Sequence, residues 1–267
     1  MALYSVEHIR RMRGGSQSHL IRASDNRYYI IKVQNNPQGV RVLANEMLGS
    51  SLARLLGLPV PSVAIIDLCE IIIRYSEEMV IQLERGSEPC QPGLCCGSEF
   101  NERSFAFWPN LFSPDEVENP ADILGMLVFD KWTSNSDRRQ LVFYRERPSE
   151  LHRIMMIDQG DCFCRAKWTF SDDPAIGLCD CQKFYHRVTH LQDFEPWLSR
   201  LENEVNLRMI RKIASKIPGQ WYRNDRAALD DLIVKLDGRR MLVRALVAST
   251  LRMKRDYFPR VPLVRWA

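Results

Sequence analysis

The stretch SNSDRRQLVFYR, residues 134–145, sets an aspartate between small polar residues and two arginines, directly before an apolar run. That run, residues 141–144, has the aliphatic and aromatic composition of a β-strand. A second apolar run at residues 154–157 predicts a second strand. Each of the two predicted strands therefore carries one acidic residue at an edge: Asp137 lies before the first, and Asp158 follows the second.

Upstream of these strands, the sequence predicts a small β-rich unit. A loop of small and polar residues at 14–17 leads into a hairpin over residues 18–33, whose middle has a turn composition. Apolar residues at helical spacing predict a helix over residues 40–56. Three extended runs are predicted next, at residues 62–68, 70–75 and 79–83. We therefore expect residues 1–85 to form an N-terminal lobe with one main helix.

The remaining residues, 86–267, are expected to form a mainly helical C-terminal lobe. Residues 84–119 contain several glycines, prolines and cysteines and predict an irregular linker or insertion. A helix is predicted from Asn119, as its N-cap, to about Trp132. After the two acidic strands, three further helical patterns are predicted, at residues 194–216, 225–236 and 239–254. The predicted fold class is α+β.

Composition and charge exclude several classes of protein. The 45% hydrophobic and 26% charged residues are ordinary for a globular chain. A net charge of +4 with scattered arginine pairs does not provide the basic stripe of a nucleic-acid binder, so no nucleic-acid partner is expected. No apolar run is long enough for a membrane span, and residues 1–13 lack the apolar core of a signal peptide. We therefore expect no membrane contact and a cytoplasmic location.

The eight cysteines are interpreted as free thiols, because a cytoplasmic compartment is reducing. Two C-x-C pairs, Cys162/Cys164 and Cys179/Cys181, leave zinc binding by an adaptor protein as an alternative. Structural zinc sites usually separate paired cysteines by two to four residues. The spacing therefore favours small buried side chains over metal ligands.

The order of polar residues along the chain is typical of phosphoryl transfer from ATP. A glycine-containing loop can bring backbone N–H groups close to phosphate oxygens. Lys32, on the second strand of the hairpin, supplies a positive charge, and Glu46 in the next helix keeps it charged when buried. Asp137 can accept the proton of an acceptor hydroxyl, and Asp158 can bind Mg²⁺ together with phosphates. Each feature alone also suits a structural role, but their shared order favours a kinase.

At this point the sequence resembles a known family, the HipA-like kinases, an atypical branch of the protein-kinase and phosphoinositide-kinase fold. The resemblance is carried by six segments: GGSQSHLI at 14–21, IIKV at 30–33, NEMLGSSLARLLGLPVP at 45–61, FDKWTSNSDRRQLVF at 129–143, MIDQGDCF at 156–163 and IPGQWYRNDRAALDDLIVKL at 217–236. Together they span most of the chain.

The resemblance implies a two-lobed protein-kinase-like fold with ATP in the cleft between the lobes. The implied nucleotide-binding residues are a phosphate loop, a lysine with its helix partner, and a segment near the hinge: Gly15, Ser16, Gln17, Lys32, Glu46, Gln82, Leu83 and Glu84. Asp137 is the implied catalytic base, acting with Lys32, and Asp158 the implied Mg²⁺ ligand. A protein Ser or Thr hydroxyl is the implied acceptor.

One departure from the family pattern bears on activity. Many relatives carry an asparagine as second metal ligand about five residues after the catalytic aspartate, where this chain has Val142. The nearest substitute is Gln140, whose amide oxygen is the candidate second ligand. Two alternatives therefore stay open: a pseudokinase that binds nucleotide without turnover, and an enzyme that transfers AMP.

Overall fold

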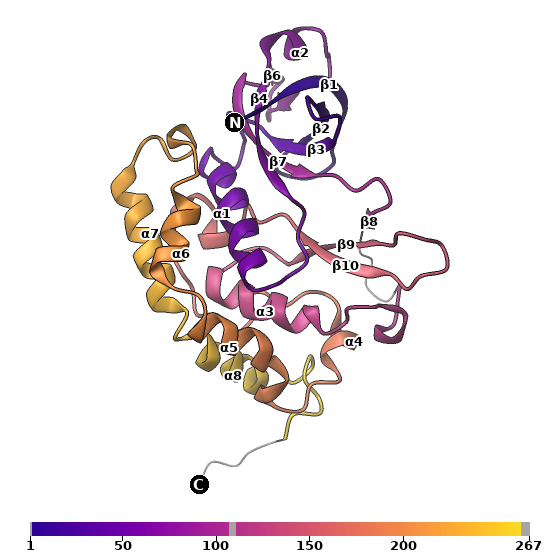
Figure 1. Cartoon of the computed structure of the whole chain (residues 1–267), viewed down its shortest axis with the longest axis vertical. Coiled ribbons are helices and arrows are strands. Elements are labelled where there is room, and N and C mark those ends of the chain that lie inside the picture. Colours follow the sequence, from indigo (N-terminus) through magenta and orange to yellow (C-terminus); the bar gives the residue numbers. More distant parts are fainter. Residues whose placement is uncertain (1, 107–110, 263–267) are drawn as a thin grey trace.

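The computed structural model describes residues 2–106 and 111–262, and its N-terminal part is a closed five-stranded barrel (Figure 1). The strands follow the order β1 (Leu3–Arg11), β2 (His19–Ala23), β3 (Tyr28–Lys32), β7 (Gly93–Glu99) and β4 (Val63–Leu68). Neighbours pair antiparallel except β1 and β4, whose parallel pairing closes the barrel. Alternate residues of these strands point inward and form a separate apolar core, which includes Ile21, Ile31, Ile66 and Cys95.

Helix α1 (Arg41–Leu55) lies beneath the barrel and joins it to the helical part (Figure 1). Most of its residues are buried, because it packs against barrel strands on one side and against the helical part on the other. It therefore belongs to the larger apolar core, together with α3 (Asp122–Thr133). Of the other long helices, α5 (Glu195–Asn203), α7 (Arg226–Arg239) and α8 (Val243–Met253) pack against α3, whereas α6 (Leu207–Ala214) packs against α1 and α7.

A second small sheet has the order β10 (Arg153–Ile157), β9 (Gln140–Tyr144) and β8 (Phe105–Ala106). Strands β9 and β10 are the two acidic-edged strands predicted from the sequence. They pair antiparallel with Gln140 opposite Ile157, so the start of β9 lies beside the end of β10. Shorter elements complete the described chain: α2 (Glu70–Arg74), β5 (Val80–Gln82), β6 (Ser87–Pro89) and α4 (Gln182–Tyr185).

The predicted hairpin and the helix over residues 40–56 are confirmed, but other elements differ. Residues 70–75 contain helix α2 instead of an extended run. The predicted helix over 194–216 is two helices, because Asn206 interrupts it and caps α6 by accepting a hydrogen bond from Met209 N–H.

The prediction of an irregular linker over residues 84–119 is wrong for its first part. Strand β7 pairs with both β3 and β4 and so completes the barrel. Strand β1 was also missed, because its exposed outer face gives it too few apolar residues to stand out. Residues 107–110 of the predicted linker lie outside the described residues.

The prediction that the eight cysteines are free thiols is wrong for two of them. Cys179 and Cys181 form a disulfide, and the other six cysteines are unpaired. Among residues 2–106 and 111–262, no group of three or more His, Cys, Asp or Glu side chains is placed to hold a metal ion, so the zinc alternative gains no support. Over the same residues, none of the helices has the length and apolarity to cross a membrane.

Candidate active site

The side chain of Lys32 connects the barrel to helix α1 and to the segment that follows β10. Its ammonium group, at the end of β3, donates hydrogen bonds to Glu46 Oε2 at 2.6 Å and to Asp158 Oδ1 at 2.5 Å. The lysine and Glu46 are both buried, whereas the Asp158 side chain keeps 22% of its surface exposed. The structure thus brings together three of the predicted site residues, although Asp158 is 126 positions from Lys32.

The two carboxylates keep this buried lysine charged. Burial alone would lower the pKa of Lys32, but Glu46 and Asp158 together raise it above its ordinary value. Burial would likewise raise the pKa of Asp158, but the Lys32 ammonium and the Gly160 N–H hold it below its ordinary value. Both groups are therefore ionised at neutral pH, which is the state that binding of phosphate and metal requires.

Helix α1 holds the segment after β10 in place. Asn45 Nδ2 donates to the carbonyl oxygens of Gly160 and Cys162 at 2.9 and 3.0 Å. The neighbouring Glu46 accepts from the Gln159 N–H at 3.1 Å. Because Asn45 and Glu46 are consecutive in α1, one helical turn fixes both the lysine and the chain that carries Asp158.

The backbone around Asp158 is adapted to this position. Asp158 has a φ of 58°, in the left-handed region that aspartate tolerates better than most residues. A Cβ atom at Gly160 would lie 2.6 Å from Lys32 Nζ. Only glycine at position 160 therefore leaves room for the lysine beside the aspartate.

Gln140 lies next to Asp158, as its predicted role as second metal ligand requires. Its side-chain amide contacts Asp158 Oδ2 at 3.2 Å, because the β9–β10 register sets Gln140 beside the end of β10. The assignment of oxygen and nitrogen in this amide follows the hydrogen bond, and rotation about the last bond would present the oxygen instead.

A cavity of about 400 Å³ opens in front of these residues. Lys32, Glu46, Asp158 and Gln140 line one part of its wall, and Ser16 of the predicted phosphate loop lines another. The rest of the wall is mainly apolar, with Ile30, Val142, Met155, Ile157, Phe100 and Phe105. An apolar cavity with a few convergent polar groups is typical of a small-molecule site.

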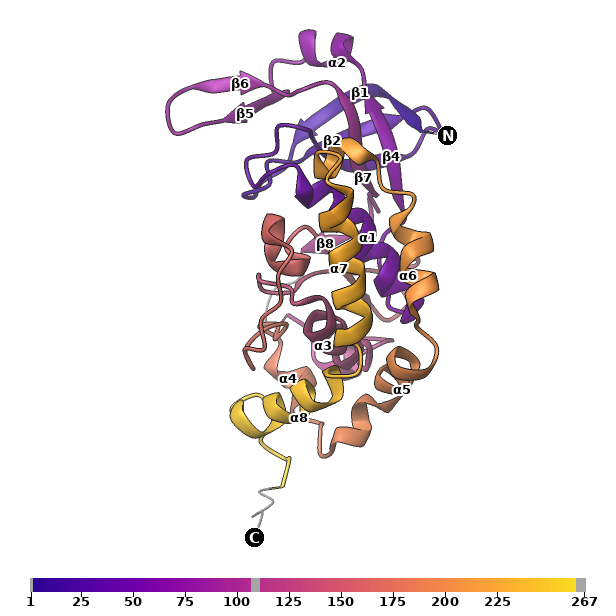
Figure 2. The same ribbon diagram turned by 90° about the vertical axis from the view of Figure 1, so that its left-hand side faces the viewer.

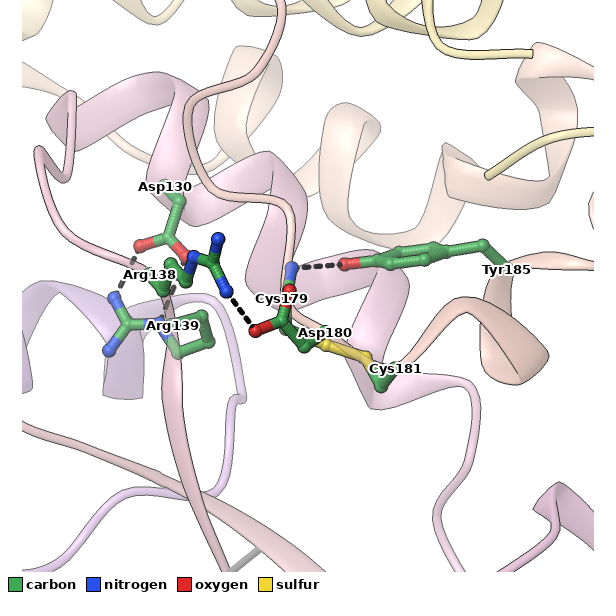
Figure 3. Close-up of a disulfide and its surroundings, with 7 residues drawn as sticks. All are labelled: Asp130, Arg138, Arg139, Cys179, Asp180, Cys181 and Tyr185. Carbon is green, nitrogen blue, oxygen red and sulfur yellow. Dashed lines mark hydrogen bonds and ion pairs between the residues drawn. A yellow bond between two sulfur atoms is a disulfide. The ribbon is translucent and has the colours of Figure 1, made fainter. Parts of the chain in front are cut away.

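Asp137 does not line this cavity. It is exposed and lines a neighbouring hollow of about 320 Å³, together with Asp173, Asp180 and Lys254. Arg138 and Asp180 also line this hollow, and Figure 3 shows the ion pair between them, with Asp180 between the two disulfide cysteines. The predicted base and the predicted metal ligand thus come from adjacent loops with separate openings.

Hydrogen bonds tie these two loops together. Ser136 N–H donates to the Asp161 carbonyl oxygen at 3.0 Å. Arg139 donates to the Ile157 carbonyl oxygen at 2.9 Å and forms a fully buried ion pair with Asp130 of α3 (Figure 3). The position of Asp137 relative to Asp158 is therefore fixed by buried contacts of the residues beside it.

The predicted phosphate loop is the connection between β1 and β2. Ser16 lines the cavity, but Gly15 and Gln17 do not. The Gln17 side chain instead bonds to the backbone of Gln82, on β5. Of the three predicted loop residues, Ser16 alone has its side chain in the cavity wall.

The prediction for Gln82, Leu83 and Glu84 is wrong in position. They lie at the end of β5 and in the turn to β6, and none of them lines the cavity. The chain passes from the barrel to the second sheet after β7 instead, and Glu99, Phe100 and Asn101 of this connection line the cavity wall. Sequence reasoning missed them because the barrel strand before them was not predicted.

The donor set near Asp158 fits Mg²⁺ in the way that nucleotide-dependent enzymes use it. Mg²⁺ is commonly bound by one or two carboxylates, with phosphate oxygens and water completing its shell. Here Asp158 would supply the carboxylate and Gln140, with its side-chain amide rotated, a neutral oxygen, while the Lys32 ammonium beside Asp158 would bind phosphate.

Comparisons with known proteins agree with this geometry. The sequence pattern of the HipA-like kinase family matches residues 6–250. The fold is similar to that of the Helicobacter pylori proinflammatory kinase CtkA, with a TM-score of 0.56 and 12% identity over 95% of this chain and 99% of that one. It is also similar to the Golgi casein kinase, with a TM-score of 0.55 and 10% identity over 94% of this chain and 74% of that one.

A structure of the Golgi casein kinase with Mn and ADP bound gives a TM-score of 0.52 and 11% identity, over 98% of this chain and 75% of that one. At these identities the structural likenesses establish the fold alone. Comparison with curated proteins gives no match.

Proposed function

The chain belongs to the HipA-like kinase family, and from this premise we propose that it is an ATP- and Mg²⁺-dependent phosphotransferase that phosphorylates Ser or Thr hydroxyls of a protein. The single observation that carries the proposal is the contact of Lys32 with both Glu46 and Asp158 in the wall of the 400 Å³ cavity. This contact assembles a phosphate-binding cation and a metal-binding carboxylate at one site.

We propose further that the barrel and the helical part act as two lobes on either side of bound ATP. The pairing of β7 with β3 and β4 supports a division after residue 99, later than the boundary at residue 85 that the sequence suggested. The adenine then lies against the connection that follows β7, where Phe100 offers an apolar surface in the cavity wall.

Each residue of the site has a separate role in the proposed reaction. Lys32 binds the phosphates and stabilises the charge that spreads over their oxygens in the transition state. Glu46 holds Lys32 in position and keeps it charged. Asp158 and Gln140 would hold Mg²⁺, which when bound neutralises phosphate charge and orients the triphosphate.

Asp137 is proposed as the base that orients the acceptor hydroxyl and accepts its proton. Its hollow is open at the surface and separate from the nucleotide cavity, which suits a side chain on a protein better than a small enclosed substrate. The acceptor oxygen would then reach the terminal phosphate from the Asp137 side while ATP occupies the cavity.

The experiment uses the full chain with Mg²⁺ and ATP labelled at either the γ- or the α-phosphate. We expect transfer of γ-label to a Ser or Thr of a protein substrate, lost in Asp137→Ala and in Asp158→Ala. Transfer of α-label would show AMP transfer instead. Nucleotide binding without transfer of either label would overturn the enzymatic proposal and leave a pseudokinase, which the valine at position 142 would then explain.

A further inference from the structure

The β5–β6 hairpin projects from the side of the barrel and is not one of its strands (Figure 2). It lies next to the phosphate loop, residues 12–18. Two separate sets of hydrogen bonds connect the hairpin and the phosphate loop.

The first set is made by Gln17. Its side-chain Nε2 donates to the Gln82 carbonyl oxygen at 2.9 Å, and its Oε1 accepts from the Gln82 N–H at 2.7 Å. The amide of Gln17 thus pairs with the edge of β5 as a neighbouring strand would. Arg11 adds a third bond by donating to Gln17 Oε1 at 2.8 Å.

The second set is made by two consecutive asparagines that follow β3. Asn35 Nδ2 donates to Glu88 Oε1 at 2.9 Å and to the Pro89 carbonyl oxygen at 3.0 Å, so it holds β6. The buried Asn36 donates from Nδ2 to the Ser16 carbonyl oxygen at 3.0 Å, so it holds the phosphate loop. The hairpin, the asparagine pair and the phosphate loop therefore form a closed ring of contacts.

The backbone of the loop needs this support. Gln17 has a φ of 45°, in the left-handed region that is costly for residues other than glycine, asparagine and aspartate. A conformation of this kind persists only where surrounding contacts hold it. The three hydrogen bonds of the Gln17 side chain do so here, together with the bond from Gln17 N–H to the Gly14 carbonyl oxygen at 3.2 Å.

We propose that the β5–β6 hairpin sets the shape of the phosphate loop, with Gln17 as a positioning residue that binds the hairpin and makes no contact with nucleotide. The proposal rests on the proposed function for the identity of the ligand. It gives Gln17 a different role from the phosphate contact that its place in the sequence suggested, and it assigns Asn35 a role that sequence reasoning did not foresee.

The test compares Gln17→Ala and Asn35→Ala with wild type and with Gln192→Ala, a matched control at an exposed glutamine of the helical part. The first measurement is amide hydrogen exchange of residues 14–18 in protein without nucleotide. We expect exchange in both variants to rise about fivefold or more, since Gln17→Ala removes the hydrogen bonds between the loop and the hairpin and Asn35→Ala removes those that hold the hairpin in place, and Gln192→Ala to match wild type.

The second measurement is the affinity for Mg²⁺-ATP and for adenosine by calorimetry. We expect Gln17→Ala to weaken ATP binding roughly five- to tenfold and to leave adenosine binding within about twofold, because the loop faces the phosphates. Gln17→Glu, which can still accept from Gln82 N–H and Arg11, should lie between wild type and Gln17→Ala.

The outcomes separate the two proposals. Unchanged exchange in Gln17→Ala, or equal weakening of ATP and adenosine, would overturn the role of the hairpin. Failure of wild type to bind ATP would overturn the proposed function, while the exchange measurement would still decide whether the hairpin shapes the loop.

Discussion

Lys32 shows how strongly a single residue depends on its surroundings in this chain. A lysine with two carboxylates at 2.5–2.6 Å is held in one orientation, and its charge is stabilised against burial. The residue opposite it is Gly160, whose missing side chain leaves the space that the ammonium group fills. The geometry of the candidate site at this scale is thus decided by a glycine as much as by the charged residues.

Replacing Gly160 with alanine should displace Lys32 without unfolding the protein. The added Cβ meets the flexible end of a side chain, so the lysine can move, but it loses its hydrogen bond to Asp158. We expect ATP affinity to fall roughly tenfold or more, as measured by calorimetry. Gly238→Ala is the control: nothing lies within 4 Å of the new atom, and the helix should gain about 0.5–1 kcal/mol in stability. Normal ATP binding by Gly160→Ala would contradict this account of the site.

Gln140 is expected to act on the metal more than on the nucleotide. Gln140→Leu removes the amide beside Asp158 and keeps a side chain of similar length. Loss of such a supporting group typically weakens metal binding roughly 10–100-fold. Titration of Mn²⁺ in the presence of ATP would measure this loss, with adenosine affinity as the control. An unchanged Mn²⁺ affinity would show that Asp158 and the phosphates bind the metal ion without help from Gln140.

At the scale of elements, α3 is joined to the segment around Asp158 through one buried ion pair. Asp130 on α3 holds Arg139, which directly precedes β9 and donates to the backbone at the end of β10. The sequence stretch 134–145 therefore contains both the exposed Asp137 and the arginine that anchors its loop. Arg138, which lies between Asp137 and Arg139 in the chain, is exposed, and among the described ion pairs it forms one with Asp180 alone (Figure 3).

Arg139→Met should be strongly destabilising, because it leaves Asp130 as a buried charge without its partner. The expected loss is about 3–5 kcal/mol in the free energy of unfolding, measured by urea denaturation. Asp180→Ala provides the matched control, since it breaks the neighbouring but exposed ion pair and should cost less than about 1 kcal/mol. Equal losses in the two variants would refute the structural role of Arg139.

Sequence reasoning succeeded for elements whose partners are near in the chain. The β2–β3 hairpin, α1 and the β9–β10 pair follow from local apolar patterns and turn residues. It failed for β7, whose glycines and cysteines resemble a loop, because its strand conformation comes from pairing with β3 and β4, whose residues are about 25 to 70 positions away. The predicted hinge segment Gln82–Glu84 lies outside the cavity wall for the same reason, since the connection that does line the wall follows the unpredicted strand β7.

At the scale of the whole molecule, α1 connects two apolar cores. One core fills the barrel, and the other extends from α1 through α3 to the C-terminal helices. The 400 Å³ cavity lies where these two parts meet, so its residues come from β3, α1, the β1–β2 connection, the connection after β7, and the β9–β10 pair. The barrel must therefore be folded for the cavity to form.

The barrel carries a pH-sensitive group in His19, which is fully buried between His8 and Cys90. Burial lowers the pKa of His19 to about 4, from an ordinary value of 6.5. The unfolded chain takes up a proton on this residue at higher pH than the folded chain, so the contribution to stability is present above pH 6.5 and is lost as pH falls to 4. The loss amounts to roughly 3 kcal/mol.

Thermal and urea unfolding of wild type and His19→Leu at several pH values would measure this effect. Carboxylates titrate over part of the same range in both proteins, so the difference between the two isolates the histidine. We expect the stability of wild type to fall more steeply than that of His19→Leu between pH 6.5 and 4. Parallel curves would show that His19 does not titrate differently in the folded and unfolded chain.

Local sequence patterns identify the candidate site residues and the elements that carry them: a lysine on a hairpin strand, a glutamate in the next helix, and two aspartates at strand edges. These follow from short-range patterns, because turns, strand alternation and helical spacing are set by neighbouring residues. Only contacts in the folded chain decide that β7 closes the barrel and that Phe100 and its neighbours form part of the cavity wall. The same is true of the place of Asp137 in the wall of a separate hollow, and of the hydrogen bonds from Gln17 to the hairpin. Those outcomes depend on contacts between distant segments, whose free energy comes from burying the barrel and the helical core as wholes.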